Sequence, residues 1–358
     1  MTSRQEQFSG TMKVRERHRF DEAALERYMI GHVAGFTKGL KVDQFKGGQS
    51  NPTYLLTDGA GKSYVLRRKP PGKLLKSAHA VDREYRVITA LGQHSDVPVA
   101  RTYALCTDES IIGTWFYIMD CVEGRIFWDA AIPQVGNTER AALFDAMNET
   151  IATLHMVDPA AIGLGDYGKP GNYFARQIAR WSGQYEQDEE AGRFKAMDRL
   201  VQWLPDNIPP GDDTAIVHGD FRIDNLIFDK EEPKVRAILD WELSTLGHPL
   251  ADFSYHLMMY RMPPQGFTGL LGADLKALNI PSEQDYIARY CARTGRDLIP
   301  DGHMNFYVAF NMFRLAAILH GILGRVKRGT AASKHAAAQG QMCEPLAELA
   351  WNQIKESA

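Results

Sequence analysis

Short runs of alternating apolar and polar residues fill the chain from about residue 41 to residue 119. The runs VDQF, TYLL, SYVL and TWFYIM are rich in Tyr, Val, Ile and Phe, and glycine and aspartate turns separate them. Such runs predict β-strands. One helix is predicted between them, over residues 78–91, because its apolar positions recur at helical spacing. These positions are Val81, Tyr85, Ile88 and Leu91.

After Gly124 the period of the apolar positions changes. Residues 138–157 and 306–326 have long patterns with a period of 3.6, which predict helices. Two strand-like runs interrupt this helical part, TAIVHGDFRIDNLIFD and VRAILDWE, and the connecting KEEPK predicts a hairpin turn at Pro233. The pattern predicts an α+β chain with a β-rich first part and a mainly helical second part.

The most apolar long stretch starts at Asn305 and contains Asn311, Arg314 and His320. A helix spanning a membrane would have to bury these polar groups in lipid, at a high cost in free energy. We therefore expect a core helix of a folded lobe here, and no contact of the protein with a membrane.

Composition narrows the class of protein further. The 358 residues, 44% of them hydrophobic, can fill the cores of two lobes. A formal net charge of -3 and a pI near 6.4 show no basic excess, so we expect no nucleic-acid partner. Widely spaced cysteines and a charged first 35 residues, without an apolar signal core, predict free thiols in the cytoplasm.

Four polar groups interrupt the apolar run from Ile216 to Phe228. His218, Asp220 and Asn225 fit H-x-D-x-x-x-x-N, the spacing of a kinase catalytic loop. In that loop the aspartate meets the substrate hydroxyl and the asparagine binds magnesium. Asp240 follows the next apolar strand, where a kinase has its second magnesium ligand. A hairpin between the two strands would bring Asn225 and Asp240 to the same end.

A glycine turn and an ion pair are expected upstream. Gly47 and Gly48 separate two strands, which would let backbone N–H groups approach a phosphate without obstruction by a Cβ atom. In SYVLRRK the alternation puts Arg67 on the same face as Val65. Glu84 on the following helix is then the expected ion-pair partner of Arg67, as in the strand-cation and helix-glutamate pair of kinases.

With these parts in order, the chain resembles the aminoglycoside phosphotransferase family, and within it the kinase-like domains fused to acyl-CoA dehydrogenases. The resemblance rests on GGQSNPTY, YVLRRKPPG, DREYRVITAL, FYIMDCVEGR, VHGDFRIDNLIF and AILDWELSTLGHPLADFSYHL, between residues 46 and 257. It implies a protein-kinase-like two-lobed fold that binds ATP, with a small β-rich N-terminal lobe, 1–119, and a larger helical lobe, 120–358. The chain would cross between lobes near Asp120 to Gly124.

The resemblance also implies a set of site residues. Gly47, Gly48, Ser50 and Asn51 would form the phosphate loop. Arg67 stands where the family usually has lysine, and Lys69 is the alternative clamp for phosphate. Asp220 would accept the proton of the attacking hydroxyl and Arg222 would stabilise charge, while Asn225 and Asp240 would hold Mg²⁺. His218 is expected to bond loop backbone, and Asp252 to tie the catalytic loop to the core helix or to cap it.

The length of the segment between two aspartates limits the class of molecule that could accept the phosphoryl group. Eleven residues between Asp240 and Asp252 leave no space for an activation segment that would hold a peptide. Residues 301–358 hold six Lys or Arg against four Asp or Glu, which favours an anionic acceptor such as a hydroxy acid or a hydroxyacyl-CoA. The basic residues concerned are Arg314, Arg325, Lys327, Arg328 and Lys334.

We therefore expect an ATP- and Mg²⁺-dependent kinase that phosphorylates a small-molecule hydroxyl. One alternative is a nucleotide-binding pseudokinase, which Arg67 in place of lysine favours. Another is an enzyme of the aminoglycoside 3'-phosphotransferase type. A metallohydrolase using His218, Asp220, Asp240 and His248 as metal ligands is a third, although it leaves the glycine turn and Glu84 unexplained.

Overall fold

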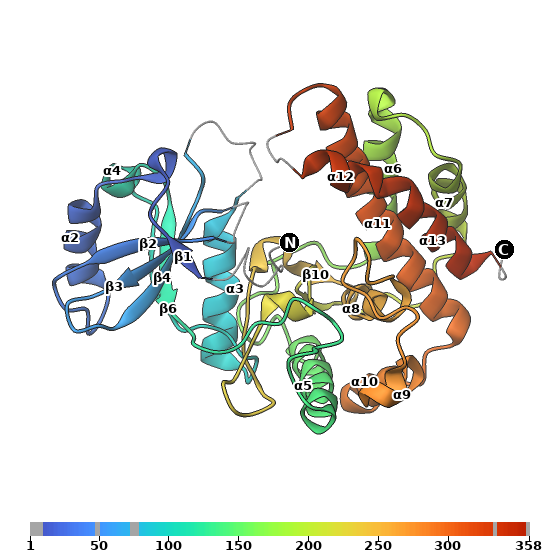
Figure 1. Cartoon of the computed structure of the whole chain (residues 1–358), viewed down its shortest axis with the longest axis horizontal. Helices are drawn as coiled ribbons and strands as arrows, with labels where there is room; N and C mark the ends of the chain where they lie inside the picture. Colours follow the sequence, from blue (N-terminus) through green and yellow to red (C-terminus); the bar gives the residue numbers. More distant parts are fainter. Residues whose placement is uncertain (1–9, 47–50, 72–78, 332–334, 356–358) are drawn as a thin grey trace. The chain divides into compact units, whose positions relative to one another are not determined.

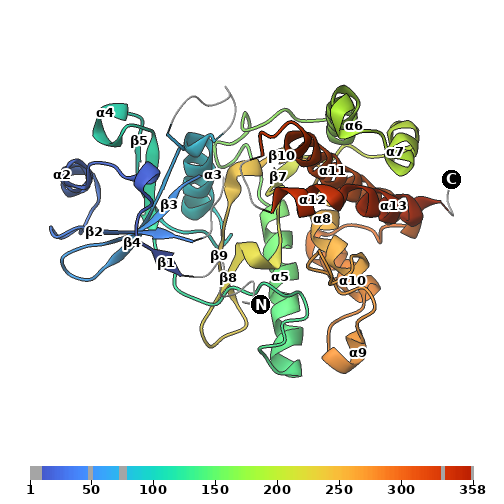
Figure 2. The same cartoon turned by 45° about the horizontal axis from the view of Figure 1, so that its top comes forward.

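The computed structural model describes residues 10–46, 51–71, 79–331 and 335–355. The chain divides into two compact units (Figures 1 and 2). The first contains residues 1–128, 160–164 and 223–244, and the second contains 129–159, 165–222 and 245–358. Each unit is described by itself below. The lobe limits predicted from the sequence, 1–119 and 120–358, remain a prediction.

An antiparallel sheet forms the framework of the first unit. Its six strands follow the order β1-β2-β3-β4-β6-β5. Their bounds are β1 (Thr11–Met12), β2 (Lys41–Phe45), β3 (Thr53–Thr57), β4 (Ser63–Arg68), β5 (Thr102–Cys106) and β6 (Phe116–Asp120). The strands expected between residues 41 and 119 are present, and β5 is an additional strand that the pattern did not reveal.

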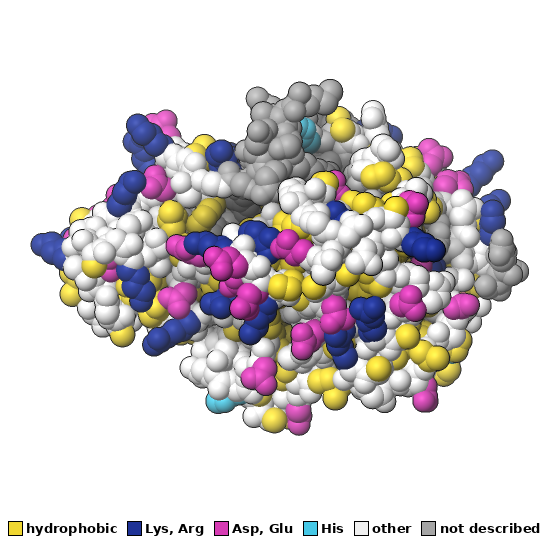
Figure 3. All heavy atoms as spheres, turned by 60° about the horizontal axis from the view of Figure 1, so that its bottom comes forward, with side chains coloured by type: hydrophobic (Ala, Val, Ile, Leu, Met, Phe, Trp, Pro, Cys, Tyr) yellow, Lys and Arg dark blue, Asp and Glu magenta, His cyan; other side chains and the backbone are white. Residues whose placement is uncertain are grey.

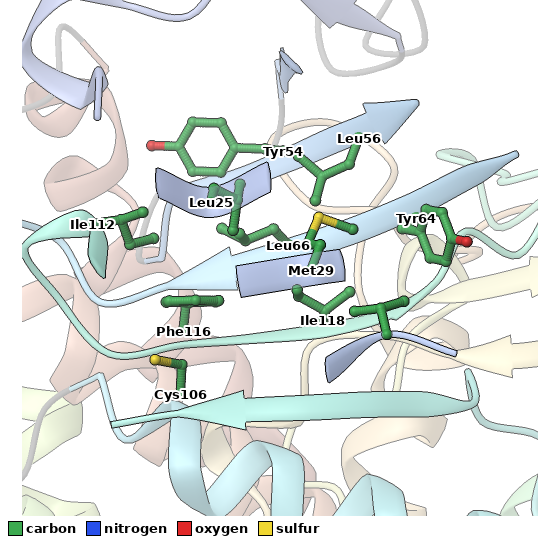
Figure 4. Packing of buried hydrophobic residues seen from close by; sticks show 11 residues of the cluster. Leu25, Met29, Tyr54, Leu56, Tyr64, Leu66, Cys106, Ile112, Phe116 and Ile118 are labelled. Carbon is green, nitrogen blue, oxygen red and sulfur yellow. The ribbon is translucent and has the colours of Figure 1, made fainter. Parts of the chain in front are cut away.

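Two helices cover one face of this sheet. Leu25 and Met29 of α2 (Glu22–His32) are fully buried against Leu66 and Ile118 of the central strands, as Figure 4 shows. The short helix α4 (Glu109–Ile112) adds Ile112 to the same cluster. Truncating a fully buried leucine to alanine costs about 2–5 kcal/mol, so this cluster is a main source of the unit's stability.

The helix α3 (Val81–His94) packs against strands β5 and β6 of the sheet. It starts and ends three residues later than the predicted 78–91. Val81, Ile88 and Leu91 are buried as expected, but Glu84 is buried too, whereas Tyr85 is half-buried. A carboxylate therefore occupies a position on the buried face of the helix.

A hairpin completes the first unit. The strands β8 (Leu226–Phe228) and β9 (Val235–Ile238) pair antiparallel around the predicted turn, which confirms the hairpin. Gly124 approaches it so closely that a Cβ atom there would lie 2.1 Å from the carbonyl oxygen of Phe228. Arg125 then forms paired backbone hydrogen bonds with Phe228, 2.8 Å in both directions. Glycine is needed at 124 for this contact.

The second unit is mainly helical, as predicted. It contains α5 (Asn137–His155), α6 (Tyr173–Gln187), α7 (Lys195–Asp206), α8 (Pro249–Arg261), α9 (Leu275–Leu278), α10 (Glu283–Thr294), α11 (Asp301–Lys327), α12 (Ala336–Gln341) and α13 (Cys343–Ile354). A small sheet pairs β7 (Ala215–Val217) with β10 (Thr245–Gly247). The helix α11 packs against α6, α8, α12 and α13. The protein has the α+β fold expected from the sequence.

The helix α11 contains the apolar stretch considered as a membrane span. Among the described residues it is the one helix long and apolar enough to cross a membrane, but 72% of its most apolar window is buried inside the protein. Asn311 on this helix is fully buried, and its Nδ2 donates to the carbonyl oxygen of Ala251 and to Ser254 Oγ, both at 2.8 Å. The amide nitrogen of this side chain is thus hydrogen-bonded within a protein core.

Charges on the surface agree with the balanced composition. On the face shown in Figure 3, basic and acidic side chains are interspersed among the described residues.

Candidate active site

The buried side chain of Arg67 on β4 faces α3 and carries three ion pairs. Its Nε lies 2.8 Å from Oε2 of Glu84, and its Nη2 lies 2.5 Å from Oδ1 of Asp240 and 3.4 Å from Oε2 of Glu242. The expected pair with Glu84 is present. The alternation of strand β4 explains it, because Tyr64 and Leu66 point to the core cluster with α2 while Arg67 points to the opposite face.

Glu84 is held by neutral donors as well as by Arg67. The hydroxyl of Tyr117 donates to its Oε2 at 3.1 Å, and Nδ2 of Asn51 donates to its Oε1 at 2.9 Å. Burial raises the pKa of the Glu84 carboxyl above its ordinary value, and the positive charge of Arg67 opposes this shift. Buried carboxylates need such a partner to remain charged.

Burial acts in the opposite sense on the cation. It would lower the pKa of the Arg67 guanidinium, but the charges of Glu84 and then Asp240 raise that pKa above its ordinary value. Arg67 therefore stays protonated. One guanidinium pairs with carboxylates from different elements, which a lysine ammonium with its point charge would bridge less well.

Asn51 is the described member of the expected phosphate loop. It is fully buried, and its Oδ1 lies 2.9 Å from Nδ1 of His79. Gly47, Gly48 and Ser50 lie outside the described residues.

Lys69, the alternative phosphate clamp, has other partners. Its Nζ lies 3.8 Å from the ring centre of Trp115 and 3.9 Å from Oδ1 of Asp82. The strand-cation and helix-glutamate pair of this chain is therefore made by Arg67.

The two expected magnesium ligands lie at the same end of the β8–β9 hairpin. Leu226 is paired with Ile238, and the backbone N–H of Leu239 donates to the carbonyl oxygen of Asn225 at 2.8 Å. Asp240 follows with a positive φ of 65°, a left-handed conformation that costs free energy for a residue with a Cβ atom. This backbone turn ends the strand, and the side chain of Asp240 meets Arg67.

Asp220 and Arg222 belong to the second unit, on the loop after β7. The hydroxyl of Tyr255 on α8 donates to Oδ1 of Asp220 at 2.7 Å, and Nε of Arg222 lies 3.1 Å from the same oxygen. His218 accepts from the backbone N–H of Asp220 through Nδ1 at 3.2 Å, so it bonds loop backbone as expected.

Asp252 anchors this loop from inside α8. The backbone N–H groups of His218 and Gly219 donate to its two carboxylate oxygens at 2.7 and 2.8 Å, and Nε2 of His155 lies 3.2 Å away. Burial acts to raise the pKa of Asp252, but His155 and the loop donors bring it below its ordinary value. The tie to the core helix is present, whereas the cap of α8 is made by His248.

The predicted basic cluster separates into different environments. Nη2 of Arg314 donates to the carbonyl oxygen of Gly219 at 3.0 Å, next to Asp220. Arg328 instead forms an ion pair with Asp188 at 2.6 Å. At 1.5 Å per residue, about 21 Å of helix separates it from Arg314. Lys334 lies outside the described residues.

In each unit, a tyrosine that the sequence did not indicate bonds one of the expected residues. The hydroxyl group of Tyr117 donates a hydrogen bond to Glu84, and that of Tyr255 donates one to Asp220. The signal for Tyr255 is its position three residues after Asp252, on the same face of a helix. Among the described residues there is no cluster of three or more His, Cys, Asp or Glu that could hold a metal ion, so the four ligands of the metallohydrolase alternative do not form one.

A six-stranded sheet with a helix-borne glutamate paired to a strand cation, followed by a mainly helical unit with an H-x-D loop, is the arrangement of kinase-like phosphotransferases. Residues 41–294 match the model of the phosphotransferase enzyme family, and the chain belongs to this family. The predicted resemblance, the fold class and the assignment as a phosphotransferase are thereby confirmed.

Particular relatives are similar over nearly the whole chain. A probable acyl-CoA dehydrogenase of Arabidopsis thaliana is 44% identical over 96% of this chain, and acyl-CoA dehydrogenase family member 11 of Gallus gallus is 44% identical over 95%. In both cases the match covers 44% of the relative, so the chain spans less than half the length of these curated relatives.

Solved structures show the same fold. A putative aminoglycoside phosphotransferase from Ralstonia eutropha is 52% identical and superposes with a TM-score of 0.87, covering 94% of this chain and 99% of that chain. Spectinomycin phosphotransferase in complex with ADP shares the fold at 14% identity, with a TM-score of 0.63 over 92% of this chain and 98% of that chain.

Proposed function

We propose that this protein transfers the γ-phosphoryl group of ATP to the hydroxyl group of a small molecule, with Mg²⁺ as cofactor. The observation that carries the proposal is the buried guanidinium of Arg67, which pairs with Glu84 on α3 and with Asp240 at the end of the hairpin. A strand cation fixed by a helix glutamate is the device with which kinases bind the phosphates of a nucleotide.

The donor set fits a magnesium ion. Asp240 offers a carboxylate and Asn225 an amide oxygen, and Mg²⁺ prefers oxygen ligands of this kind. The bound ion would neutralise charge on the phosphates of the nucleotide. Gly47, Gly48, Ser50 and Asn51 would cradle these phosphates, and Arg67 would bind them from the strand.

Asp220 supports the transfer at the acceptor side. In the proposed step the acceptor oxygen attacks the γ-phosphorus while the bond from that phosphorus to the β–γ bridging oxygen breaks. The proton of the acceptor hydroxyl passes to the carboxylate of Asp220, and ADP leaves. Arg222, whose Nε lies 3.1 Å from Asp220, would stabilise charge that develops on the transferred group.

We propose a hydroxy acid or a hydroxyacyl-CoA as acceptor. Two observations support an anionic acceptor. Arg314 contacts the loop that carries Asp220, and the curated relatives are named acyl-CoA dehydrogenases. A guanidinium next to the catalytic loop can bind a carboxylate or phosphate through paired hydrogen bonds. We propose a cytoplasmic location, since the four cysteines are free thiols.

A panel of acceptors tests the proposal. Purified protein is incubated with ATP, Mg²⁺ and single hydroxylated compounds: hydroxy acids, hydroxyacyl-CoA thioesters, amino alcohols and kanamycin. ADP release and the phosphorylated product are measured together. We expect turnover with an anionic acceptor and a loss of more than about 1,000-fold in Asp220→Ala, because the proton acceptor is removed.

The same experiment separates the alternatives. Nucleotide binding without turnover on any acceptor would support a pseudokinase, and turnover with kanamycin alone would support the aminoglycoside 3'-type enzyme. An Asp220→Ala variant as fast as the parent protein would contradict the proposed mechanism.

A further inference from the structure

Tyr255 reaches the loop of Asp220 from the same face of α8 as Asp252. Residues three apart on a helix lie side by side, so α8 presents both side chains to this loop. Asp252 accepts hydrogen bonds from the backbone N–H groups of His218 and Gly219. The hydroxyl of Tyr255 donates a hydrogen bond to the side chain of Asp220. One helix therefore holds both the backbone and the carboxylate of the loop.

The contact is a hydrogen bond of ordinary length to a carboxylate oxygen. The Tyr255 hydroxyl lies 2.7 Å from Oδ1 of Asp220, and Nε of Arg222 lies 3.1 Å from that same oxygen. The terminal torsion of an aspartate is soft, so the carboxylate plane is set by its hydrogen bonds. Burial and the charge of Asp220 raise the pKa of Tyr255, which keeps its hydroxyl protonated as a donor.

Arg314 supports the ring that carries this donor. Its guanidinium carbon lies 5.5 Å from the ring centre of Tyr255, within the range of a cation–π contact. The same guanidinium donates to the carbonyl oxygen of Gly219 at 3.0 Å. Gly219 has a φ of 83°, which turns the loop between its two anchors. The Tyr255 ring and the loop are thus fixed to the same side chain of α11.

We propose that Tyr255 is a positioning residue for phosphoryl transfer, whose hydroxyl orients the carboxylate of Asp220 toward the acceptor hydroxyl. This inference rests on the proposed function. A general base works only within hydrogen-bond reach of the proton it takes, and small errors of orientation lower the rate steeply. Tyr255 acts through Asp220 and need not touch the substrate.

The same helix supplies a matched control. Tyr260 on α8 is also buried, but among the described residues its hydroxyl oxygen has no hydrogen-bond partner. Tyr255→Phe and Tyr260→Phe each delete a single hydroxyl from α8. Only the first deletion removes a hydrogen bond to Asp220.

Steady-state kinetics test the proposal with ATP, Mg²⁺ and 3-hydroxybutyrate as acceptor probe, and with water as acceptor in a parallel ATPase assay. We expect Tyr255→Phe to lower kcat about 10- to 100-fold, the size expected for the loss of one hydrogen bond to a charged group. The KM for ATP should change less than about twofold, and Tyr260→Phe should match the parent protein.

A double variant separates orientation of Asp220 from a general effect on packing. In an Asp220→Asn background, followed by single-turnover assays with radiolabelled ATP, Tyr255→Phe should add no further loss of rate. The inference would be overturned if Tyr255→Phe lowered the rate of the Asp220→Asn variant by the same factor as it lowers that of the parent protein. It would also be overturned if Tyr255→Phe had the kcat of an active parent. Either result would leave the proposed function intact. An inactive parent on every acceptor, water included, would overturn both.

Discussion

Arg67 on strand β4 and Glu84 on helix α3 form a buried ion pair of 2.8 Å, and the other end of the same guanidinium contacts Asp240. The pair joins the sheet to the helix and reaches the hairpin. Arg67 is the cation that compensates the buried carboxylate of Glu84, so removal of Arg67 leaves that carboxylate without compensation.

Arg67→Met should lower the free energy of unfolding by about 3–5 kcal/mol, because the carboxylate of Glu84 remains buried without its cation. Urea denaturation followed by circular dichroism measures the change. Arg236→Met on β9 is the control, since 54% of that side chain is exposed and its ion pair with Asp229 is 3.7 Å long. The control should differ from the parent by less than about 0.5 kcal/mol. Equal effects in the two variants would contradict the importance of the buried pair.

The hairpin contact of Gly124 predicts a steric effect. Gly124→Ala should destabilise the protein by about 1–3 kcal/mol, because the new Cβ atom would lie 2.1 Å from the carbonyl oxygen of Phe228. Gly136→Ala is the matched control, since a Cβ atom there meets no atom within 4 Å and its φ of −72° suits alanine. Thermal unfolding compares the two. A Gly124→Ala variant as stable as the control would show that the chain relaxes at this contact.

The buried His256 predicts a dependence of stability on pH. Burial lowers the pKa of His256 from 6.5 to about 4, so the unfolded chain binds more protons than the folded protein between these values. The contribution is fully present above pH 6.5 and is lost as the pH falls toward 4. It amounts to about 3 kcal/mol.

Urea denaturation at pH 7.5, 6, 5 and 4.5 measures this loss. His256→Gln should reduce the pH dependence of stability, because glutamine does not titrate in this range, whereas His248, whose pKa burial also lowers to about 4, keeps its own contribution. The control is His94→Gln at the exposed end of α3, which should keep the slope of the parent protein. The assignment to His256 fails if His256→Gln keeps that slope as well.

Arg314 should affect the binding of the acceptor rather than the binding of the nucleotide. Arg314→Gln is expected to raise the KM for an anionic acceptor about 10- to 100-fold with less than a twofold change in the KM for ATP, because one charge-assisted contact is lost. Arg328→Gln, at the far end of the same helix, is the control and should leave both constants unchanged. Unaltered acceptor kinetics in Arg314→Gln would contradict the proposed anionic acceptor.

The periodic segments of the fold could be predicted from the sequence. The period-2 alternation of SYVLRR placed Arg67 and the core residue Leu66 on opposite faces, and the helix expected over 306–326 exists as α11. The five-residue strand β5 was missed because TYALC carries no alternation or turn signal of its own, and α2 because only Leu25 and Met29 of its residues are buried.

The site could be predicted where the contact follows from local geometry. Glu84 was expected to pair with Arg67 because kinases pair a strand cation with a helix glutamate, and Asn225 was expected near Asp240 because a hairpin joins their strands. Tyr117 could not be predicted, because its hydrogen bond joins elements that only the tertiary fold brings together. The pairing of Arg67 with Asp240 was missed for the same reason. Tyr255 was missed because its one signal in the sequence is its spacing of three residues from Asp252.

The replacement of lysine by Arg67 has a consequence for labelling experiments. Reagents that acylate the strand amine of kinases require a nucleophilic nitrogen, and a guanidinium held protonated by Glu84 and Asp240 does not supply one. A nucleotide analogue that carries an acyl phosphate should therefore leave position 67 of this chain unlabelled, although it would acylate a lysine at that position.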